Sequence, residues 1–401
     1  MKILQINKFY FLKGGSERYL FDLSKLLKQK GHKVIPFSMK DERNLPSEYS
    51  EYFIENINLH KFNIINIIKF FYNYEAVRNL EELIRREKPD IAHLHNIAHQ
   101  LTPAIINVLK KNNIPVVQTL HDYKLICPNS KLFTNGKYCE ACRGGRYYNC
   151  FLRNCMHKSR AMSFLGMLEA YLNSKIKKVY DGVDMFIAPS EFMRNVSLKF
   201  GISGKKIKVI NNFVEALNLK SDPVMAVDDY LLYFGRLSDE KGIASLLEAM
   251  KNVKSAIKLK IVGAGPDRNK LESISKKMEL ENKVEFLGPK YGAALADLIN
   301  GSMAVVIPSV WPENMPYSLL ESMSAGKAVI ASRTGGMGEI IENGTNGFLF
   351  SPGNIRELVE VIDDLPNRDL LAIGKSAADK AGSLNPLNHY FQLIKIYNRF
   401  V

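Results

Sequence analysis

The sequence predicts an α/β protein made of two doubly wound halves, each a parallel sheet with helices on both faces. Short apolar runs alternate with amphipathic helical stretches, and this alternation is repeated in both halves of the chain. With 401 residues, of which 46% are apolar and 24% charged, the chain is large enough for two hydrophobic cores. Ser221-Asp222-Pro223 interrupts the periodicity between the halves. We therefore expect a first domain over residues 1–215 and a second over residues 228–385.

The individual elements follow from two signals. Apolar runs of four or five residues predict buried strands, and apolar residues at a period near 3.6 predict helices. In the first half the predicted strands are 2–6, 33–37, 90–94, 116–120 and 185–188, and the predicted helices are 17–30, 75–88 and 103–111. In the second half the predicted strands are 230–234, 258–262, 284–287, 304–307 and 328–331. Open parallel sheets bind ligands beyond the carboxyl ends of their strands, so the loops that follow these strands are the place to look for a site.

Two carboxylates, Glu313 and Glu321, follow the apolar run 304–309 and lie eight positions apart. Pro316 lies between them and suits the first turn of a helix, because the amide that proline lacks would be unpaired there. Glu313 then lies in a strand-to-helix loop, and Glu321 lies one turn inside the helix. The free amides and the dipole at a helix N-terminus favour an anion such as a diphosphate. Charge stabilisation of the helix N-terminus, worth about 0.3–1 kcal/mol, is the alternative explanation of the two carboxylates.

Other motifs accompany this pair in a fixed order. They are Phe234-Gly-Arg236 with Lys241-Gly242, Ile261-Val-Gly263-Ala-Gly265-Pro, Pro308-Ser309, Thr334-Gly335-Gly336 with Glu339, and, near the N-terminus, Gly14-Gly15-Ser16-Glu17 and His121-Asp122. The set resembles the motifs of the retaining glycosyltransferases of family 4, including their Glu-x7-Glu signature, over nearly the whole chain. The resemblance implies the GT-B fold, in which two Rossmann-like domains face each other across a cleft. It also implies that the C-terminal helix, here residues 386–401, packs back onto the first domain.

The resemblance assigns roles in transferring a sugar from a nucleoside diphosphate to an acceptor hydroxyl with retention of the anomeric configuration. Arg236 and Lys241 would clamp the leaving diphosphate, because a guanidinium and an ammonium can together meet its developing charge. Glu321 would bind the ribose hydroxyls and Glu313 the hydroxyls of the transferred sugar. The chain has no Asp-x-Asp triplet, which favours a metal-independent enzyme in which Arg236 and Lys241 replace a divalent ion. No cofactor is then required for catalysis.

Other positions complete the expected donor site. The backbone amides of Asn314 and Met315 would bind the diphosphate, and Gly263 and Gly265 resemble the turn beneath the nucleobase, where missing side chains allow close approach. A plain turn is the alternative for these two glycines. The sequence departs from the commoner family pattern at Asn314-Met315, where Gly-Phe-Gly is frequent. We expect this departure to change the shape of the sugar pocket.

In the first half, Gly14 and Gly15 follow the first strand and open a helix. Glycines there expose amides to an anion, and the resemblance places this loop against the donor diphosphate and the acceptor; a simple tight turn is the alternative. His121 resembles the family's histidine near the donor sugar, which contacts it through its backbone carbonyl. His95 is predicted to be structural or to line the acceptor site.

The excess of positive charge lies in the first half. Residues 1–215 carry 34 Lys and Arg against 19 Asp and Glu, whereas residues 216–401 carry 21 against 22. Because many relatives act on lipid-linked acceptors, the excess favours an anionic membrane surface. The apolar stretch 60–72, which contains Lys61 and Lys69, is a candidate contact, but its apolar face favours a core helix of the first domain. The sequence shows no signal peptide and no apolar run of eighteen residues, which predicts a cytoplasmic protein at the inner face of the membrane.

All five cysteines fall within 29 positions, at Cys127, Cys139, Cys142, Cys150 and Cys155. In a reducing compartment such a cluster suggests a structural zinc site, with Cys139 and Cys142 as the knuckle. Free thiols in an acceptor loop are the alternative.

The leading interpretation is a retaining hexosyltransferase that adds one sugar to a saccharide or lipid-linked acceptor in bacterial surface polysaccharide (O-antigen, capsule or exopolysaccharide) or glycolipid synthesis. A nucleotide-sugar epimerase or a phosphorylase of the same fold is the first alternative. A nucleic-acid binder is a remote third, suggested by the basic and aromatic stretch from Arg143 to Arg153; no recognised nucleic-acid motif accompanies it, so we expect no nucleic-acid partner.

Overall fold

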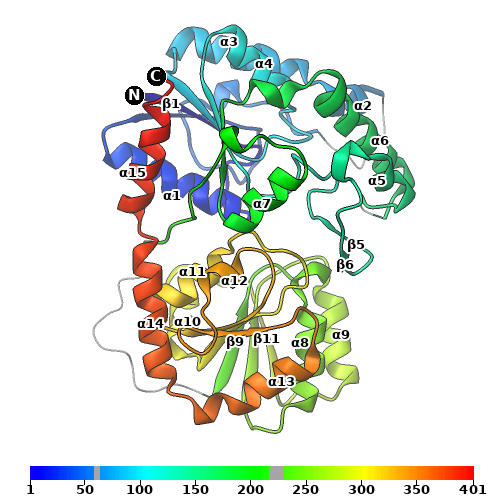
Figure 1. Cartoon of the computed structure of the whole chain (residues 1–401), viewed down its shortest axis with the longest axis vertical. Coiled ribbons are helices and arrows are strands. Elements are labelled where there is room, and N and C mark those ends of the chain that lie inside the picture. The colour runs from blue at the N-terminus through cyan, green and yellow to red at the C-terminus, as the bar shows by residue number, and fades with distance from the viewer. Residues whose placement is uncertain (58–63, 157, 216–228) are drawn as a thin grey trace. The chain divides into compact units, whose positions relative to one another are not determined.

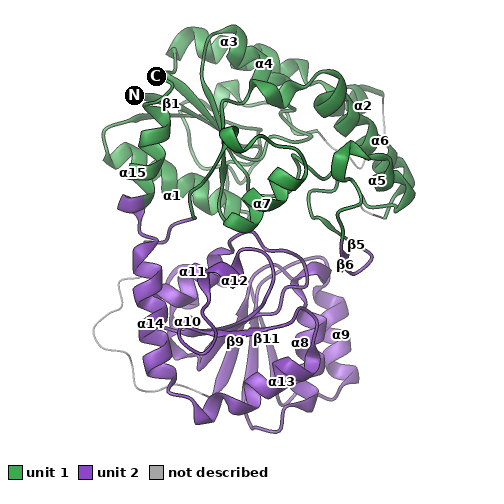
Figure 2. Ribbon diagram, viewed as in Figure 1, with its two compact units in different colours: residues 1–134, 139–211, 389–401 green, residues 135–138, 212–388 purple. Residues whose placement is uncertain are grey.

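The computed structural model describes residues 1–57, 64–156, 158–215 and 229–401. The chain divides into two compact units (Figure 2). Unit 1 comprises residues 1–134, 139–211 and 389–401, and unit 2 comprises residues 135–138 and 212–388. Apart from residues 135–138, the chain enters unit 2 at Asn212, a few residues before the expected boundary, and returns to unit 1 at His389.

Unit 1 contains a six-stranded sheet whose pairs are all parallel (Figure 1). Its strands, in spatial order, are β2 (Lys33–Phe37), β1 (Lys2–Ile6), β3 (Ile91–Leu94), β4 (Val116–Thr119), β7 (Met185–Ala188) and β8 (Ile207–Val209). The direction of winding reverses between β1 and β3, which makes the carboxyl ends of these two strands the switch point of the sheet. All of the predicted strands are present, and β8, a short edge strand, was not predicted. A two-stranded hairpin, β5 (Phe133–Thr134) and β6 (Lys137–Tyr138), stands apart from this sheet.

The helices of unit 1 begin close to the predicted positions where a capping signal marks them. Asn73, for example, accepts hydrogen bonds from the amides of Glu75 and Ala76 and starts α3. The helices are α1 (Gly15–Gln29), α2 (Ile64–Phe71), α3 (Tyr74–Glu87), α4 (Ala104–Lys111), α5 (Tyr148–Leu152), α6 (Arg160–Tyr171) with its π-helical continuation η3 (Leu172–Ile176), and α7 (Glu191–Lys199). Short 3-10 turns are η1 (Ser50–Tyr52), η2 (Arg143–Gly145), η4 (Val179–Gly182) and η5 (Gly204–Lys206).

The C-terminal helix α15 (Pro386–Tyr397) carries the chain from unit 2 to unit 1. Its buried polar side chains bond to elements of unit 1. Nε2 of His389 lies 2.9 Å from the hydroxyl of Tyr19 on α1, and the hydroxyl of Tyr397 lies 2.6 Å from Nδ1 of His93 on β3. These contacts attach the last turns of α15 to unit 1.

Unit 2 contains a second six-stranded parallel sheet. Its strands, in spatial order, are β11 (Val284–Gly288), β10 (Lys258–Val262), β9 (Tyr230–Phe234), β12 (Ala304–Ile307), β13 (Ala328–Ser332) and β14 (Phe348–Phe350). This is the common order of nucleotide-binding sheets, and its switch point lies between β9 and β12. The five predicted strands are confirmed, and the edge strand β14 was not predicted.

Both faces of the unit 2 sheet are buried, each under its own apolar cluster. Successive side chains of a strand point to opposite faces, so each strand contributes to both clusters. On β9, Leu231 and Tyr233 belong to one apolar cluster, while Tyr230, Leu232 and Phe234 belong to the other. The first cluster includes residues of α8 (Ile243–Asn252), α9 (Arg268–Lys277) and α13 (Ile355–Asp364), and the second includes residues of α10 (Gly292–Gly301), α11 (Tyr317–Ser324), α12 (Met337–Ile340) and α14 (Leu370–Ser383). The remaining turns are η6 (Asp239–Lys241) and η7 (Leu365–Asn367).

Among the described residues, no helix combines the length and the apolar character that crossing a bilayer requires.

Candidate active site

The two strands at the switch point of unit 2 lead directly into the predicted donor-site residues. Leu231 and Leu232 of β9 pair with Ala304 and Val305 of β12 in parallel register, so the carboxyl ends of both strands lie at one edge. The chain leaves β9 through Arg236 to Lys241 and leaves β12 through Ser309 to Glu313. The fold thus brings together residues that lie more than seventy positions apart in the sequence.

Lys241 and Glu313 contact each other at this edge. The ammonium Nζ of Lys241 donates to Oε1 of Glu313 over 2.5 Å, and the hydroxyl of Ser309 donates to the same oxygen over 2.7 Å. The Glu313 side chain is only 6% exposed and that of Lys241 22% exposed, so the ion pair is largely shielded from water. Both Lys241 and Glu313 were predicted as site residues. Their ion pair and the bond from Ser309 were not predicted.

Two glycines allow the loops of this edge to approach each other closely. Gly242 has φ of +71°, and a Cβ atom there would lie 2.0 Å from the carbonyl oxygen of Pro308. Gly335 has φ of +60°, and a Cβ atom there would lie 1.7 Å from the carbonyl oxygen of Glu313. The amide of Gly336 donates to that same carbonyl over 2.8 Å. The loops after β9, β12 and β13 therefore fix the backbone that carries Lys241 and Glu313.

Gly263 and Gly265 have a packing role that the sequence did not reveal. A Cβ atom on Gly263 would lie 1.8 Å from the carbonyl oxygen of Gly235, and one on Gly265 would lie 2.1 Å from that of Leu237. The amide of Leu237 also donates to the carbonyl of Ala264 over 2.9 Å. The loop after β10 is therefore pressed against the loop that carries Arg236. Contact with a nucleobase at these glycines stays a prediction.

Arg236 presents its side chain to solvent. The hydroxyl of Tyr233 donates to the backbone carbonyl oxygen of Arg236 over 2.8 Å, which holds the backbone at Arg236. Burial raises the pKa of Tyr233 well above its usual value, so the phenol remains a donor. Within the described parts of the chain, the Arg236 guanidinium forms no ion pair, and it is exposed at the edge where Lys241 and Glu313 meet.

The predicted helix after Glu313 is α11, and Glu321 is its fifth residue, one turn inside as expected. Pro316 lies immediately before the helix, not within its first turn as predicted; its carbonyl accepts from the amides of Leu319 and Leu320 over 3.1 and 3.4 Å. Asn314 and Met315 are buried, and the side-chain amide of Asn212 donates to the Met315 carbonyl over 3.0 Å. The predicted donor-site residues 236, 241, 263, 265, 313, 314, 315 and 321 thus all belong to unit 2.

In unit 1, the carboxyl edge of the sheet carries the remaining predicted residues. Gly14 and Gly15 are exposed where α1 begins. Gly14 has an extended backbone with φ of −172°, so no strain requires glycine at that position. Glu17, one turn further, is 3% exposed and accepts hydrogen bonds from Asn7 and Ser16 over 3.1 and 2.9 Å. Burial raises the pKa of Glu17.

His121 and His95 form a pair at the same edge. Nδ1 of His95 lies 2.9 Å from Nε2 of His121, and Nε2 of His95 lies 2.6 Å from Oε1 of Gln5. Since the Gln5 oxygen only accepts, Nε2 of His95 donates to it and Nδ1 accepts from His121. Burial lowers the pKa of His121 to about 3 and that of His95 well below its usual value, so both imidazoles are neutral. His95 is buried within this network, and its predicted role as a structural or acceptor-lining residue stays a prediction.

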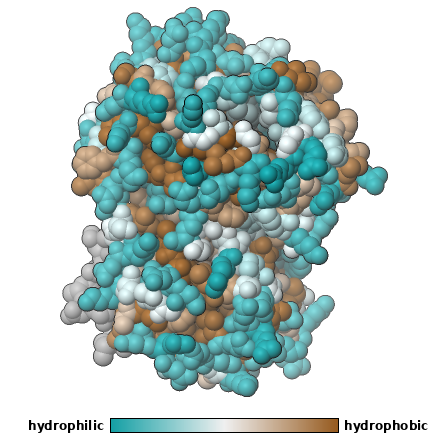
Figure 3. Space-filling model, in the orientation of Figure 1, coloured by the Kyte–Doolittle hydropathy of each residue, from teal (hydrophilic) through white to brown (hydrophobic). Residues whose placement is uncertain are grey.

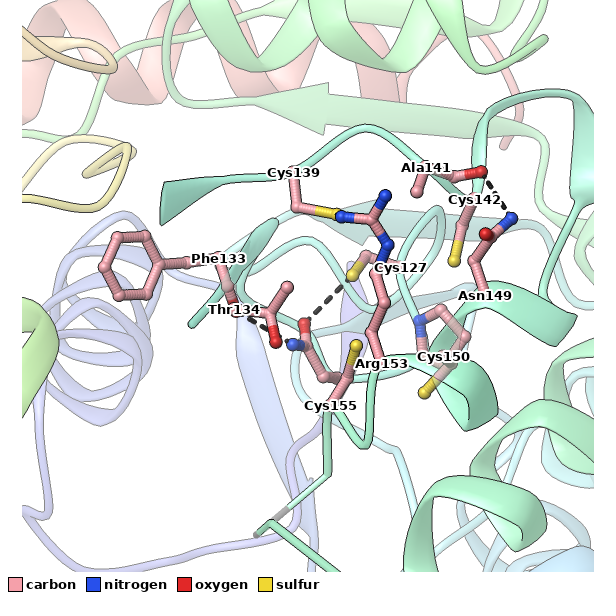
Figure 4. A pocket seen from close by; sticks show the side chains of 12 residues that line it. Cys127, Phe133, Thr134, Cys139, Ala141, Cys142, Asn149, Cys150, Arg153 and Cys155 are labelled. Atoms are coloured by element: carbon pink, nitrogen blue, oxygen red, sulfur yellow. Dashed lines mark hydrogen bonds between the residues drawn. The ribbon is translucent and has the colours of Figure 1, made fainter. Parts of the chain in front are cut away.

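The five thiols of unit 1 line one cavity (Figure 4). The hydrogen bond from Cys150 lowers the pKa of Cys155 to about 7, whereas burial raises the pKa of Cys127 to about 11 and that of Cys142 to about 12. Cys139 accepts a hydrogen bond from Arg153 over 3.6 Å. Thiolates are ligands that zinc prefers. In the described part of the chain, however, no three side chains of His, Cys, Asp or Glu are arranged to hold one metal ion. The zinc site stays a prediction.

Comparisons with known proteins agree with these motifs. The family model described as Glycosyltransferase Family 4 matches residues 13–216, and the one described as Glycosyl transferases group 1 matches residues 222–377. An uncharacterized 42.6 kDa protein in the cps region of Klebsiella pneumoniae is 27% identical over 361 residues, which are 85% of this chain and 87% of that protein. An uncharacterized glycosyltransferase of Methanocaldococcus jannaschii is 27% identical over 350 residues, which are 85% and 82% of the two chains.

A solved structure resembles the whole chain. The Anabaena protein HepE in complex with UDP-glucose superposes with a TM-score of 0.71 at 20% sequence identity, and the match covers 100% of each chain. This likeness concerns the fold, and it confirms the GT-B fold class that the sequence predicts.

Proposed function

Because the chain belongs to glycosyltransferase family 4, we propose that it is a retaining, metal-independent hexosyltransferase that uses a nucleoside-diphosphate sugar. The observation that carries the proposal is the contact among Lys241, Glu313 and Ser309 at the switch point of the unit 2 sheet. A switch point is where nucleotide-binding sheets hold their ligands. This one carries a cation and a carboxylate, which suit a diphosphate and a sugar.

The cations can meet the charge that develops on the leaving diphosphate. An ammonium has three donors, and Lys241 uses one of them for Glu313, so two remain for phosphate oxygens. The exposed Arg236 adds a guanidinium, which binds phosphate in a bidentate manner. The positive end of the α11 dipole lies in the loop after Glu313 and favours the same anion. These three contributions would act where a divalent ion acts in other transferases.

Glu313 has one oxygen left for the substrate. Among the described residues, its donors Lys241 and Ser309 both bond to Oε1, so Oε2 can accept from a hydroxyl of the transferred sugar. We assign this role to Glu313 and assign the ribose hydroxyls to Glu321. Neither carboxylate acts as a nucleophile in this scheme. The leaving phosphate would take the proton of the acceptor hydroxyl on the same face of the sugar, which retains the configuration.

We propose a lipid-linked or saccharide acceptor of bacterial surface polysaccharide or glycolipid synthesis, used at the inner face of the cytoplasmic membrane. Two findings support this proposal. Residues 1–215 carry the whole excess of positive charge. The Klebsiella relative is named for its place in a cps region.

A panel of nucleotide sugars tested for thermal stabilisation would identify the donor, because a ligand that binds only the folded state raises the melting temperature. Transfer assays with the stabilising donor would then compare Glu321→Ala with Lys251→Ala, an exposed control on α8. We expect Glu321→Ala to abolish stabilisation by the donor and transfer, and the control to keep both. Epimerisation or phosphorolysis of the donor without an acceptor would contradict the proposal.

A further inference from the structure

Exposed apolar side chains of unit 1 gather on four neighbouring elements, α2, α5, α6 and η3. On α2, Ile64 is 69% exposed, Ile65 61% and Ile68 51%. On α5, α6 and η3, exposure is 69% for Leu152, 43% for Phe164, 38% for Leu168 and 73% for Ile176. Figure 3 shows apolar surface along the side of the molecule where Figure 1 places α2, α5 and α6. Scattered exposed apolar residues need no explanation, but a concentration on adjoining elements indicates an interaction surface.

Helix α6 is apolar on two opposite sides. Its inner side chains Met162 and Ala170 belong to an apolar cluster. Its outer stripe, at positions 161, 164 and 168, is also apolar and exposed, where a solvated helix would carry polar residues. An apolar helix that is covered on one side only is unusual for a water-facing surface. The outer stripe of α6 is therefore a candidate contact surface.

These elements form one continuous surface. Phe70 of α2 and Cys150 of α5 lie in the same buried cluster as Met162 of α6. The rings of Phe151 and Phe164 are 5.7 Å apart. The ammonium of Lys177, just after η3, lies 5.6 Å from the ring of Tyr72, just after α2. The stretch 60–72 is thus no core helix within its described part, because Phe70 is the only buried residue of α2; residues 60–63 lie outside the described residues.

The exposed charges of the segment from α5 to η3 have one sign. From residue 148 to residue 178 the chain carries Arg153, Lys158, Arg160, Lys175, Lys177 and Lys178. All six are exposed. The only acid of this stretch, Glu169, is 3% exposed and is paired with Lys124 over 2.8 Å. We call the apolar residues of α2, α5, α6 and η3, together with these six cations, the apolar-basic face.

We infer that the apolar-basic face docks unit 1 on the surface of an anionic lipid bilayer. Apolar side chains would enter the boundary between head groups and acyl chains, and the surrounding cations would meet the anionic head groups. A protein partner would need acidic residues around an apolar patch, whereas an anionic bilayer supplies both features everywhere on its surface. Docking would give unit 1 access to a lipid-linked acceptor, and this purpose rests on the proposed function.

Vesicle binding tests the inference without any substrate. Wild-type protein should co-sediment with vesicles of phosphatidylcholine and phosphatidylglycerol, less with pure phosphatidylcholine, and less again as the salt concentration rises. The variant Ile64→Gln with Leu168→Gln removes two exposed apolar groups from the face. We expect it to bind about tenfold or more weakly. Its matched control is Leu371→Gln with Tyr291→Gln, two residues of unit 2 that are 61% and 70% exposed, and this control should bind as wild type does.

A second pair of variants tests the charges. Arg160→Gln with Lys175→Gln should weaken binding to the anionic vesicles by about tenfold or more and should reduce its salt dependence. Lys276→Gln with Lys277→Gln, on the exposed end of α9, removes the same charge elsewhere and should change binding little. If Lys276→Gln with Lys277→Gln weakens binding as much as Arg160→Gln with Lys175→Gln does, non-specific charge explains binding and the inference is wrong. If Leu371→Gln with Tyr291→Gln weakens binding as much as Ile64→Gln with Leu168→Gln does, the apolar contact is not specific to this face and the inference is also wrong.

Two further measurements separate the other outcomes. If sedimentation shows a dimer that Ile64→Gln with Leu168→Gln dissociates, a second copy of this chain covers the face and the inference is overturned. Stabilisation by the donor and transfer to a soluble saccharide should be unchanged in all four variants. Loss of vesicle binding with intact transfer supports the inference, whereas absence of transfer in the wild type contradicts the proposed function and leaves the vesicle result valid by itself.

Discussion

Replacing Gly335 by alanine should disable the donor site through the backbone of Glu313. The new Cβ atom would lie 1.7 Å from the Glu313 carbonyl oxygen, whereas real Cβ atoms essentially never come within 3.0 Å of such an atom. The two loops must therefore separate by the difference, about 1.3 Å. The amide of Gly336 holds the same carbonyl over 2.8 Å, so this movement strains both partners. Displacement of a catalytic group by about 1 Å can lower the rate by about a hundredfold.

The matched control is Gly344→Ala. Gly344 also belongs to unit 2 and has φ of +81°, but no heavy atom lies within 4 Å of the Cβ position. Both variants incur the cost of a left-handed backbone at alanine, about 1 kcal/mol, and both should lower the melting temperature. Only Gly335→Ala should also lower kcat/KM, by about a hundredfold or more.

The assay compares kcat/KM for the donor and thermal unfolding of both variants. Equal activity in Gly335→Ala and Gly344→Ala would show that the position of the Glu313 backbone does not matter for transfer. That result would refute the reasoning that the loop after β13 sets the geometry of the site.

Three other predictions follow from the contacts and the pKa values. Lys241→Ala leaves the shielded Glu313 carboxylate without its cation and should destabilise unit 2 by about 1–3 kcal/mol in chemical unfolding. Adding Glu313→Gln should restore much of that stability without restoring transfer. Additive losses of stability in the double variant would contradict the pairing. Burial lowers the pKa of His121 to about 3 and that of His389 to about 4, so the unfolded chain takes up protons first as the pH falls below about 6.5. The free energy of unfolding should therefore decline to about pH 4 through His389 and to about pH 3 through His121. His389→Gln should make that decline shallower, and an unchanged slope would disagree with a neutral buried imidazole. Elemental analysis of protein purified without chelator should find one zinc per chain if Cys139, Cys142 and two later thiols bind it, and a zinc-free protein with full stability removes that prediction.

The sequence predicts the strands of both sheets well because a strand buried on both faces is a nearly continuous apolar run. Tyr230–Phe234 and Ala304–Ile307 have the predicted bounds for this reason. The edge strands Ile207–Val209 and Phe348–Phe350 have three residues each, which is too short for a periodic signal. Their positions depend on pairing with β7 and β13, which no local pattern encodes.

The candidate site could be predicted as a set of residues but not as a set of contacts. Motif order places Lys241 and Glu313 in loops after strands, and the fold does so too. Their ion pair depends on β9 and β12 being neighbours, which is a property of the sheet order alone. Gly263 shows a contact that the motif does not encode, because its backbone packs closely against the carbonyl of Gly235; contact of Gly263 with a ligand stays a prediction. A glycine in a site motif can therefore serve the loops that shape the site.

The hydrogen bond from Ser309 to Glu313 would allow Lys241 to leave the ion pair and bind an anionic ligand. If a diphosphate drew Lys241 away from Glu313, the carboxylate would become a buried charge without a partner, which is costly. The hydroxyl of Ser309 would still donate to Oε1, and a sugar hydroxyl could reach Oε2. The hydroxyl of Ser332 in turn donates to the carbonyl of Ser309, which fixes the loop that carries this donor. Binding of diphosphate and sugar together would thus cost less than binding of the diphosphate alone, which favours the intact donor over the nucleotide that remains after transfer.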